Sequence, residues 1–158
     1  MITIQIATEK DVNDIVNIHN KAFPDFFLTT LGSGFLRLYY KCMCRSKEAL
    51  ALCAVDGGEV VGFSATALKS AGFNTRLIKN NKLMFMGETC KLLFTRPKAL
   101  IRLAKNMTKS ADGIEDDGNY AELYSIGVSP TCQGQGVGSR LLSENERIIR
   151  SGGGKKYL

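Results

Sequence analysis

The chain has 158 residues, of which 44% are hydrophobic and 23% charged, and its formal net charge is +6. Its length and composition are ordinary for one globular domain with a substantial core. No apolar run reaches the roughly 20 residues of a membrane-spanning helix, and residues 1–6 lack the pattern of a signal peptide. The five cysteines have no zinc-like spacing, so we expect reduced thiols, no metal and a cytoplasmic protein.

The first part of the chain predicts a strand and then a helix. Residues 2–6 carry isoleucine at every second position, as in a strand. Thr8 and Asp11 are similar to a capping box, and Pro24 ends the helix that follows. Five apolar residues form the predicted buried stripe of this helix: Val12, Ile15, Val16, Ile18 and Ala22. His19 lies in the same helix, and we expect it at the surface or near a cap rather than in catalysis.

A second helical region and a hairpin follow. Residues 35–44 predict a helix, while residues 26–32 are either its beginning or a loop. Residues 50–55 and 60–66 predict two strands, and the segment Asp56-Gly57-Gly58-Glu59 between them is a strong hairpin turn. We therefore expect two antiparallel strands after the helical region.

The segment between this hairpin and Tyr120 is about fifty residues long, which is more than an ordinary connection. Up to Ser110 it holds ten basic residues and one acidic residue, Glu88, mixed with large apolar residues. The basic residues are Lys69, Arg76, Lys79, Lys82, Lys91, Arg96, Lys98, Arg102, Lys105 and Lys109. Their net charge of +9 (ten minus one) exceeds the +6 of the whole chain, so the remainder is net acidic. We predict a basic helical insertion at about 69–110, followed by an acidic loop at 112–118.

Three interpretations of the insertion are open. We favour a solvated helical cover beside the substrate site, because a run of charge is usually a solvated face. The insertion also fits a wall that attracts an anionic substrate, or a basic amphipathic surface that lies on a membrane or a partner. Nucleic-acid binding is not expected, because the sequence holds no recognised nucleic-acid module.

The last third of the chain carries the most informative pattern, which is a strand, a glycine-rich loop and a helix. Residues 120–128 are rich in β-branched, aromatic and small residues, and Pro130 ends this strand. Glycine occupies every second position of residues 134–138, and helical apolar spacing begins at Ser139. Such a loop presents backbone N–H groups at the positive end of a helix dipole, which suits a phosphate or pyrophosphate. A plain structural turn is the alternative.

Gln133, Gly136 and Gly138 form Gln-x-x-Gly-x-Gly directly after the strand. The spacing differs from the dinucleotide fingerprint, and the GK[ST] ending of an NTPase loop is absent. The motif resembles the acetyl-CoA signature of the GNAT superfamily of N-acetyltransferases. The order of helix pair, hairpin, strand, loop and helix is similar to that family over most of the chain. The resemblance implies an α/β (α+β) fold with a mixed, mostly antiparallel sheet flanked by helices, in a single domain over residues 1–158.

The resemblance also implies how acetyl-CoA binds as a cosubstrate. The main-chain groups of Ile126 and Val128 would pair with the pantetheine arm. The following loop residues would wrap the pyrophosphate: Gln133, Gly134, Gln135, Gly136, Val137, Gly138 and Ser139. Phe26 and Phe27 would border the acceptor site, with core packing as the alternative.

Some members of the family carry a glutamate at the position of Glu122 and use it as a general base. A base is needed because only a neutral amine attacks the thioester carbonyl. Strand alternation predicts that residues 122, 124, 126 and 128 share one face, and the N–H of Ile126 would donate to the thioester oxygen. The alternative for Glu122 is a solvated charge or an anchor for the substrate ammonium. We expect Tyr124 in a pocket wall or in the core.

Compared with the family, the chain stops early. Residues 155–158 look like the start of another strand, after which the family fold continues through a helix and two more strands. The tyrosine that often protonates the CoA thiolate belongs to that part, so no general acid is assigned. We expect either that this C-terminal part of the fold is missing from a truncated sequence, or that a partner or a second copy completes the sheet. An open edge strand would otherwise invite aggregation.

The sequence therefore predicts an N-acetyltransferase that transfers an acetyl group from acetyl-CoA to a primary amine by direct attack in a ternary complex. The acceptor would be a small-molecule amine, and the basic insertion suggests an anionic one. The alternative is a non-catalytic acyl-CoA-binding or regulatory module. A third hypothesis is an adaptor that uses the insertion on a membrane or a nucleic acid.

Overall fold

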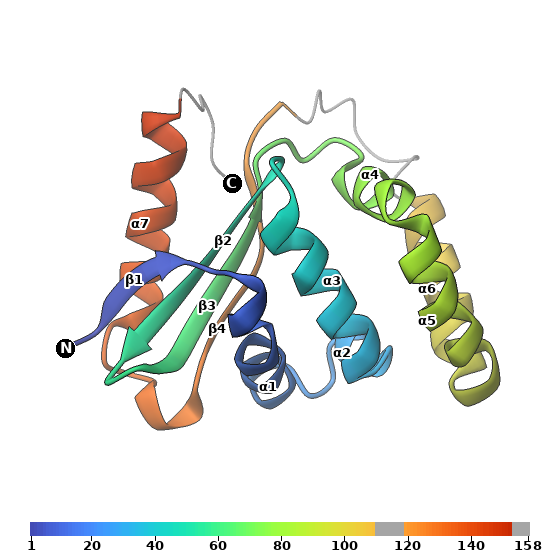
Figure 1. Cartoon of the computed structure of the whole chain (residues 1–158), viewed down its shortest axis with the longest axis horizontal. Coiled ribbons are helices and arrows are strands. Elements are labelled where there is room, and N and C mark those ends of the chain that lie inside the picture. The colour runs from blue at the N-terminus through green and yellow to red at the C-terminus, as the bar shows by residue number, and fades with distance from the viewer. Residues whose placement is uncertain (110–118, 153–158) are drawn as a thin grey trace.

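The computed structural model describes residues 1–109 and 119–152, and its centre is a four-stranded antiparallel sheet (Figure 1). The strands, in the order in which they lie side by side, are β1 (Thr3–Ile6), β2 (Ala49–Asp56), β3 (Glu59–Ala67) and β4 (Glu122–Val128). The predicted fold class, an antiparallel sheet flanked by helices, is confirmed. The predicted acidic loop at 112–118 and the strand at 155–158 lie outside the described residues.

Helices cover both faces of the sheet (Figure 1). On one side lie α1 (Val12–Ala22) and α3 (Ser33–Arg45), with the short α2 (Phe27–Thr30) between them in the chain, and on the other side lies α7 (Val137–Ser151). Because strand side chains alternate between faces, the sheet contributes to two cores. Phe63 belongs to the core under α1 and α3, whereas Leu52 belongs to the core under α7. In the described part of the chain, no helix is long and apolar enough to cross a membrane.

The tight hairpin between β2 and β3 follows from its turn glycines. Gly57 and Gly58 both have positive φ, at 58° and 90°, in a region that glycine adopts without steric cost. Asp56 pairs with Glu59 across the turn, as the sequence predicts. The pairing shifts by one residue at Val61, between the pairs Val55–Val60 and Ala54–Gly62, so the turn together with this shift sets which β3 side chains face each core.

A capped 3₁₀ turn, η1 (Glu9–Asp11), leads directly into α1, which carries one buried histidine. The backbone N–H and the hydroxyl of Thr8 donate to Asp11 Oδ2 at 2.7 and 2.8 Å, as expected for the predicted cap. The predicted stripe is buried except for Ala22, which is half-buried. His19 is fully buried, so the expectation of a surface histidine is wrong. The packing of α1 on α3 and the sheet hides its ring among four others: Phe23, Phe26, Tyr40 and Phe63.

A β-bulge interrupts β4. Leu123 pairs with Thr66 of β3 and Ser125 pairs with Ala65, so Tyr124 is an extra residue between two paired positions. An extra residue shifts the alternation of side chains by one position, and the residues on either side of it change faces.

The bulge separates the residues that were expected on one face of β4. Glu122 pairs with Ala67, which belongs to the core under α1 and α3, and Tyr124 packs against the same core. Ile126 and Val128 pack instead against the core under α7. The prediction of one shared face for these four residues is therefore wrong.

Three helices occupy the segment that the sequence predicts to be a basic helical insertion. They are α4 (Phe73–Asn80), α5 (Lys82–Thr95) and α6 (Pro97–Lys109). They form a layer outside α3 (Figure 1), and Phe85 of α5 packs edge-on against Phe35 of α3 with ring centroids 5.4 Å apart. The inner face of α5 is therefore joined to the core of the domain.

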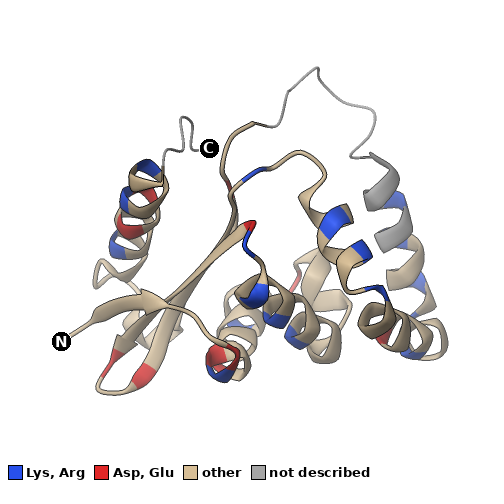
Figure 2. Cartoon of the chain, turned by 45° about the horizontal axis from the view of Figure 1, so that its top comes forward, with Lys and Arg blue, Asp and Glu red and all other residues tan. Residues whose placement is uncertain are grey.

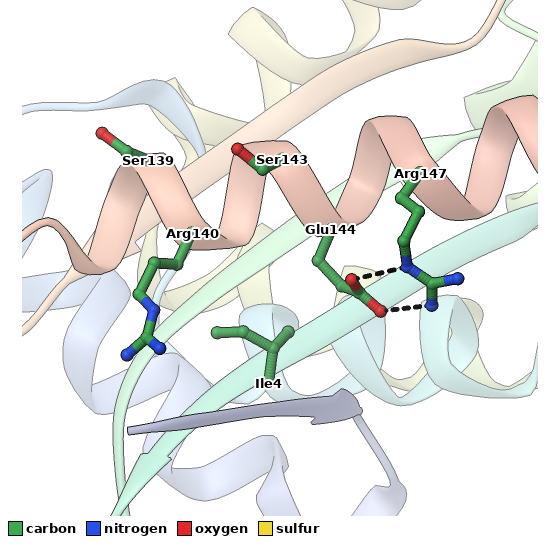
Figure 3. A pocket seen from close by; sticks show the side chains of 6 residues that line it. All are labelled: Ile4, Ser139, Arg140, Ser143, Glu144 and Arg147. Carbon is green, nitrogen blue, oxygen red and sulfur yellow. Dashed lines mark hydrogen bonds and ion pairs between the residues drawn. The ribbon is translucent and has the colours of Figure 1, made fainter. Parts of the chain in front are cut away.

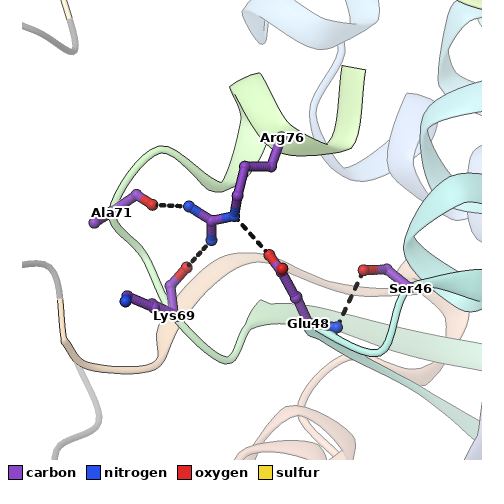
Figure 4. Close-up of polar contacts among 5 residues, drawn as sticks. All are labelled: Ser46, Glu48, Lys69, Ala71 and Arg76. Carbon is purple, nitrogen blue, oxygen red and sulfur yellow. Dashed lines mark hydrogen bonds and ion pairs between the residues drawn. The ribbon is translucent and has the colours of Figure 1, made fainter. Parts of the chain in front are cut away.

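Arg76 ties the start of this helical layer to the sheet (Figure 4). Its Nε donates to Glu48, just before β2, at 2.7 Å, and its other nitrogens donate to the carbonyl oxygens of Lys69 and Ala71. One guanidinium thus closes the loop between β3 and α4 and holds that loop beside the beginning of β2.

A buried asparagine joins α7 to the sheet. The Nδ2 of Asn145 donates to Ser64 Oγ at 2.5 Å and to the Leu141 carbonyl at 3.0 Å, and its Oδ1 accepts from Thr66 Oγ1 at 3.0 Å. All three polar side chains are fully buried. Because both ends of the amide have partners inside the protein, this cluster fixes how α7 sits on β3.

We expect Asn145→Ala to lower the free energy of unfolding by about 2 kcal/mol or more, because Ser64 and Thr66 lose a buried partner. Denaturant unfolding measures the change. The control is Asn13→Ala on the exposed side of α1, which should change stability by less than about 0.5 kcal/mol. Equal stabilities of the two variants would contradict a structural role for the buried amide.

Candidate functional site

The glycine-rich loop forms a hollow where β4 meets α7. After β4, Pro130–Cys132 make one 3₁₀ turn, and α7 begins at Val137 with Gly136 as its N-cap. Gly134 and Gly136 have φ of 77° and 75°, which other residues rarely adopt. The hollow has a volume of about 440 Å³ and is lined by Val128, Cys132, Gln133, Gly134, Gly136, Val137, Gly138 and Ser139. All of the predicted loop residues except Gln135 therefore line one cavity.

The first turn of α7 is suited to an anion. No side chain caps Gly136, and the first turn carries no acidic residue. The first N–H groups of a helix have no intrahelical partner and lie at the positive end of its dipole. A Cβ at Gly134 or Gly136 would meet no atom within 4 Å, so these glycines are required by their backbone conformation and leave open space beside the loop.

A second hollow lies between α7 and β1 and adjoins the first one at Ser139 (Figure 3). It has a volume of about 520 Å³, and two arginines point along it. Arg140 donates to the carbonyl of Ile2 at 3.2 Å, and Arg147 pairs with Glu144 at 2.6 Å. Both cations are engaged by the protein itself, so we assign no chemistry to this hollow.

A third cavity, of about 240 Å³, lies between α1 and β4. Aromatic rings form its apolar walls, and it is lined by His19, Phe23, Phe26, Leu123, Tyr124, Ser125 and Ile126. Phe26 is thus placed in a cavity wall, whereas Phe27 packs on the core and stacks under Arg102, with the guanidinium carbon 5.3 Å from the ring centroid. The bulge at Tyr124 brings residues of both faces of β4 into this wall.

His19 is the polar group of this cavity. Its Nδ1 lies 2.7 Å from the Tyr40 hydroxyl, which lies 3.0 Å from Ser125 Oγ. Its Nε2 is buried and has no hydrogen-bond partner among the described residues. Burial lowers the pKa of the imidazole to about 4, so the ring is neutral at pH 7. A neutral imidazole with one unpaired nitrogen in a cavity wall is able to bind a polar group of a ligand.

The sequence does not indicate that this histidine lies in a cavity wall, because its partners are distant. Tyr40 is 21 residues away from His19, and Ser125 is 85 residues away from Tyr40. His19 lies in α1, Tyr40 in α3 and Ser125 in β4, and only the packing of these three elements brings the chain of hydrogen bonds together. A single histidine inside an apolar helix gives no local signal for such a contact.

Glu122 lies beside this cavity but does not line it. It is half-buried, and its Oε2 accepts a hydrogen bond from the Ser70 hydroxyl. Burial, reinforced by the Glu122 carboxylate, raises the pKa of Tyr124 to about 12. Tyr124 therefore stays a phenol at pH 7 and stands between Glu122 and the cavity. The role of Glu122 as a base stays a prediction.

The cavity and the loop hollow are connected along β4. Ile126 lines the cavity and Val128 lines the loop hollow, and two residues of a strand span roughly 7 Å. Among the described strands, none pairs with the outer edge of β4. The strand therefore offers main-chain groups to a ligand that extends from the helix N-terminus to the aromatic cavity.

Comparisons with known proteins identify relatives of this arrangement. A model described as the acetyltransferase (GNAT) family matches residues 12–158. The structure of the aminoglycoside 6′-N-acetyltransferase AAC(6′)-Ig from Acinetobacter haemolyticus aligns with a TM-score of 0.60 and 14% identity over 98% of this chain and 76% of that chain. AAC(6′)-Iy in complex with a bisubstrate analogue aligns with a TM-score of 0.62 and 11% identity over 100% of this chain and 78% of that chain.

A GNAT family acetyltransferase from Brucella melitensis in complex with acetyl-CoA aligns with a TM-score of 0.57 and 17% identity, over 99% of this chain and 73% of that chain. At these identities the likeness shows a shared fold. No curated protein matches the chain by sequence.

We expect the buried His19 to make stability depend on pH. Its pKa is about 4 in the folded protein and near 6.5 in the unfolded chain, so the unfolded chain binds the proton more readily. The contribution of neutral His19 to the free energy of unfolding is complete above pH 6.5. It is lost as pH falls toward 4, by up to about 3 kcal/mol. Denaturant unfolding of the wild type and His19→Gln at pH 7 and pH 5 measures it. The same loss of stability in both proteins would show that His19 is not the cause.

Proposed function

This chain belongs to the acetyltransferase (GNAT) family, and we propose that it transfers the acetyl group of acetyl-CoA to a primary amine of a small-molecule acceptor. The observation that carries the proposal is the connection along β4 between an anion-suited helix N-terminus and an aromatic cavity with one unpaired polar atom. Its five cysteines are unpaired, which supports a reducing compartment such as the cytoplasm.

In this proposal, the backbone N–H groups of residues 134–139 bind the CoA pyrophosphate. The support is the positive φ of Gly134 and Gly136, the open space beside both, and the absence of any acid in the first turn of α7. The main chain of Ile126 and Val128 binds the pantetheine arm along the outer edge of β4. The thioester then lies beside the cavity, with the N–H of Ile126 directed to its oxygen.

The reaction is direct attack in a ternary complex. The amine nitrogen forms a bond to the acetyl carbon, the carbon–sulfur bond breaks, and CoA leaves as a thiolate that takes up a proton. Glu122 takes the proton of the substrate ammonium through water, because it stands outside the cavity wall. The Ser70 hydroxyl holds the carboxylate in place.

The acceptor occupies the cavity between α1 and β4. Aromatic walls suit a molecule with an apolar face, and the Nε2 of His19 suits a hydroxyl or a second nitrogen on that molecule. A cavity of about 240 Å³ fits a small amine or one end of a larger one. Two of the aligned structures are aminoglycoside acetyltransferases, which supports a polyhydroxylated amine as the first class to test.

One observation favours an alternative without turnover. Glu122 already accepts a hydrogen bond from the Ser70 hydroxyl and does not line the cavity, which fits a carboxylate without a catalytic role. A non-catalytic acyl-CoA-binding module would have the same glycine loop. Both functions require CoA binding, and only the enzyme releases the CoA thiol in the presence of an amine. A CoA-release assay over a panel of amines separates them.

We expect Gly136→Glu to weaken CoA binding at least roughly tenfold, because it removes the positive φ and places a negative charge at the helix N-terminus. Calorimetry measures the Kd. The matched control is Gly57→Glu in the hairpin, which also has a positive φ and open space but lies outside the loop. If folded Gly136→Glu binds CoA with the same Kd as the wild type and the Gly57→Glu control, the loop is not the CoA site.

We expect Glu122→Gln to lower kcat/KM by about 10²-fold or more, most strongly on the acidic side, with the acetyl-CoA Kd unchanged. The CoA-release assay as a function of pH measures this. The control is Glu59→Gln in the exposed hairpin, which should be neutral. Wild-type turnover of Glu122→Gln across the pH range would assign Glu122 a structural or anchoring role.

A further inference from the structure

Helix α5 is apolar on two sides. On its inner side Phe85 and Leu92 are buried against the domain. On its outer side Leu83, Met86 and Phe94 are exposed, Phe94 to 86%. A surface helix of a globular protein ordinarily has one apolar face, so burial in the domain explains only half of this composition.

The exposed residues form a continuous stripe. With a period of 3.6 residues, one side of α5 collects six positions without any charge, which we call the outer face: Leu83, Met86, Gly87, Cys90, Leu93 and Phe94. All six are exposed. Lys82 and Lys91 lie on its two flanks. Exposed apolar patches of this kind usually mark a surface that docks on a partner or a membrane.

The charge around the outer face is positive. The one acid of α5, Glu88, points inward toward Gly34 of α3 and pairs with Lys91 at 2.8 Å. Among the described residues, Lys82 and Lys98 have no ion-pair partner. Figure 2 shows basic positions along α4, α5 and α6 with little acid among them.

A hollow of about 510 Å³ continues this surface at the corner between α5 and α6. Three cations meet there, because Arg96, Lys98 and Arg102 all line it. Arg96 donates to the Thr30 carbonyl at 2.9 Å, which anchors the corner to the segment after α2. The exposed Phe94 lies two residues from Arg96, so the apolar face and the cationic hollow adjoin.

We propose that the outer face of α5 docks on the surface of an anionic lipid bilayer, with its apolar side chains at the boundary between headgroups and acyl chains. Lys82 beside the outer face and Lys98 in the corner hollow then bind lipid phosphates, as in interfacial helices with lysine beside an apolar face. A second copy of this chain is a poor occupant, because a symmetric contact would place the same lysines against one another. The charge of the surface thus selects an anionic partner.

The test is co-sedimentation of the full chain with vesicles. Vesicles of phosphatidylcholine mixed with phosphatidylglycerol should bind the protein at least roughly tenfold more strongly than phosphatidylcholine alone, and salt should weaken the binding. Leu83→Ser with Phe94→Ser should reduce binding at least roughly tenfold, since both side chains are exposed and their loss leaves the fold intact. The apolar control is Ile6→Ser with Leu142→Ser, also exposed but on β1 and α7.

A comparison of charge-reversal variants completes the test. Lys82→Glu with Lys98→Glu should abolish the preference for phosphatidylglycerol, while Lys47→Glu, exposed before β2, should not. CoA affinity of every variant should equal that of the wild type, which keeps this result separate from the acetyltransferase proposal. Equal binding to both vesicle types, or vesicle binding that Leu83→Ser with Phe94→Ser leaves unchanged, would overturn the proposal. A dimer seen by sedimentation velocity and dissociated by Leu83→Ser with Phe94→Ser would also overturn it, because a second copy of the chain would then cover the outer face.

Discussion

The pairing of β4 with β3 fixes the positions of the β4 residues of the candidate site. The register places Val128 at the glycine loop, Ile126 in the wall of the aromatic cavity and Glu122 beside Ser70. Because of the bulge at Tyr124, Glu122 and Tyr124 face α1 and α3, whereas Ile126 and Val128 face α7. One extra residue in the strand thereby determines which β4 side chains lie beside the aromatic cavity and which lie beside α7.

Two buried polar clusters flank the sheet, and their hydrogen bonds distinguish their roles. On the side of α7, both ends of the Asn145 amide have partners inside the protein, as expected of a group that specifies packing. On the side of α1, the Nδ1 of His19 is hydrogen-bonded to the Tyr40 hydroxyl, while its Nε2 has no partner among the described residues and lies in a cavity wall. Because an unpaired buried polar atom is costly, it is retained most readily where a ligand uses it.

The helical layer has a similar division between packing and exposure. Phe85 and Leu92 of α5 are buried against the domain, and Arg76 anchors the layer to the beginning of β2. The outer face of α5 has no counterpart inside the described part of the chain. Lys82 and Lys91 flank that face, and three cations line the hollow at the corner with α6. A solvated cover, which the sequence favoured, accounts for the charges but leaves the exposed apolar stripe unexplained.

The sequence by itself determined the features that local chemistry controls. Paired glycines with positive φ specify the hairpin at 56–59, Pro130 ends β4, and the glycines of residues 134–138 open α7. These positions predict both the local structure and the anion-suited loop. The reason is that the positive φ of a glycine and the missing N–H of a proline are properties of the residue type and need no distant partner. The order of elements followed from periodicity and turn residues, and the fold class followed from the resemblance of that order and of the glycine loop to the GNAT superfamily.

Tertiary structure alone decided the features that depend on distant partners. His19 is buried because Tyr40 and Phe63 close over it, and a helical period carries no information about which rings those are. The bulge at Tyr124 exists in the pairing with β3 and not in the composition of β4. Helix α5 is apolar on both sides in sequence, and only its packing on Phe35 selects which side is buried and which is left exposed. Periodicity finds an apolar face, but the neighbour that covers it is fixed by the fold.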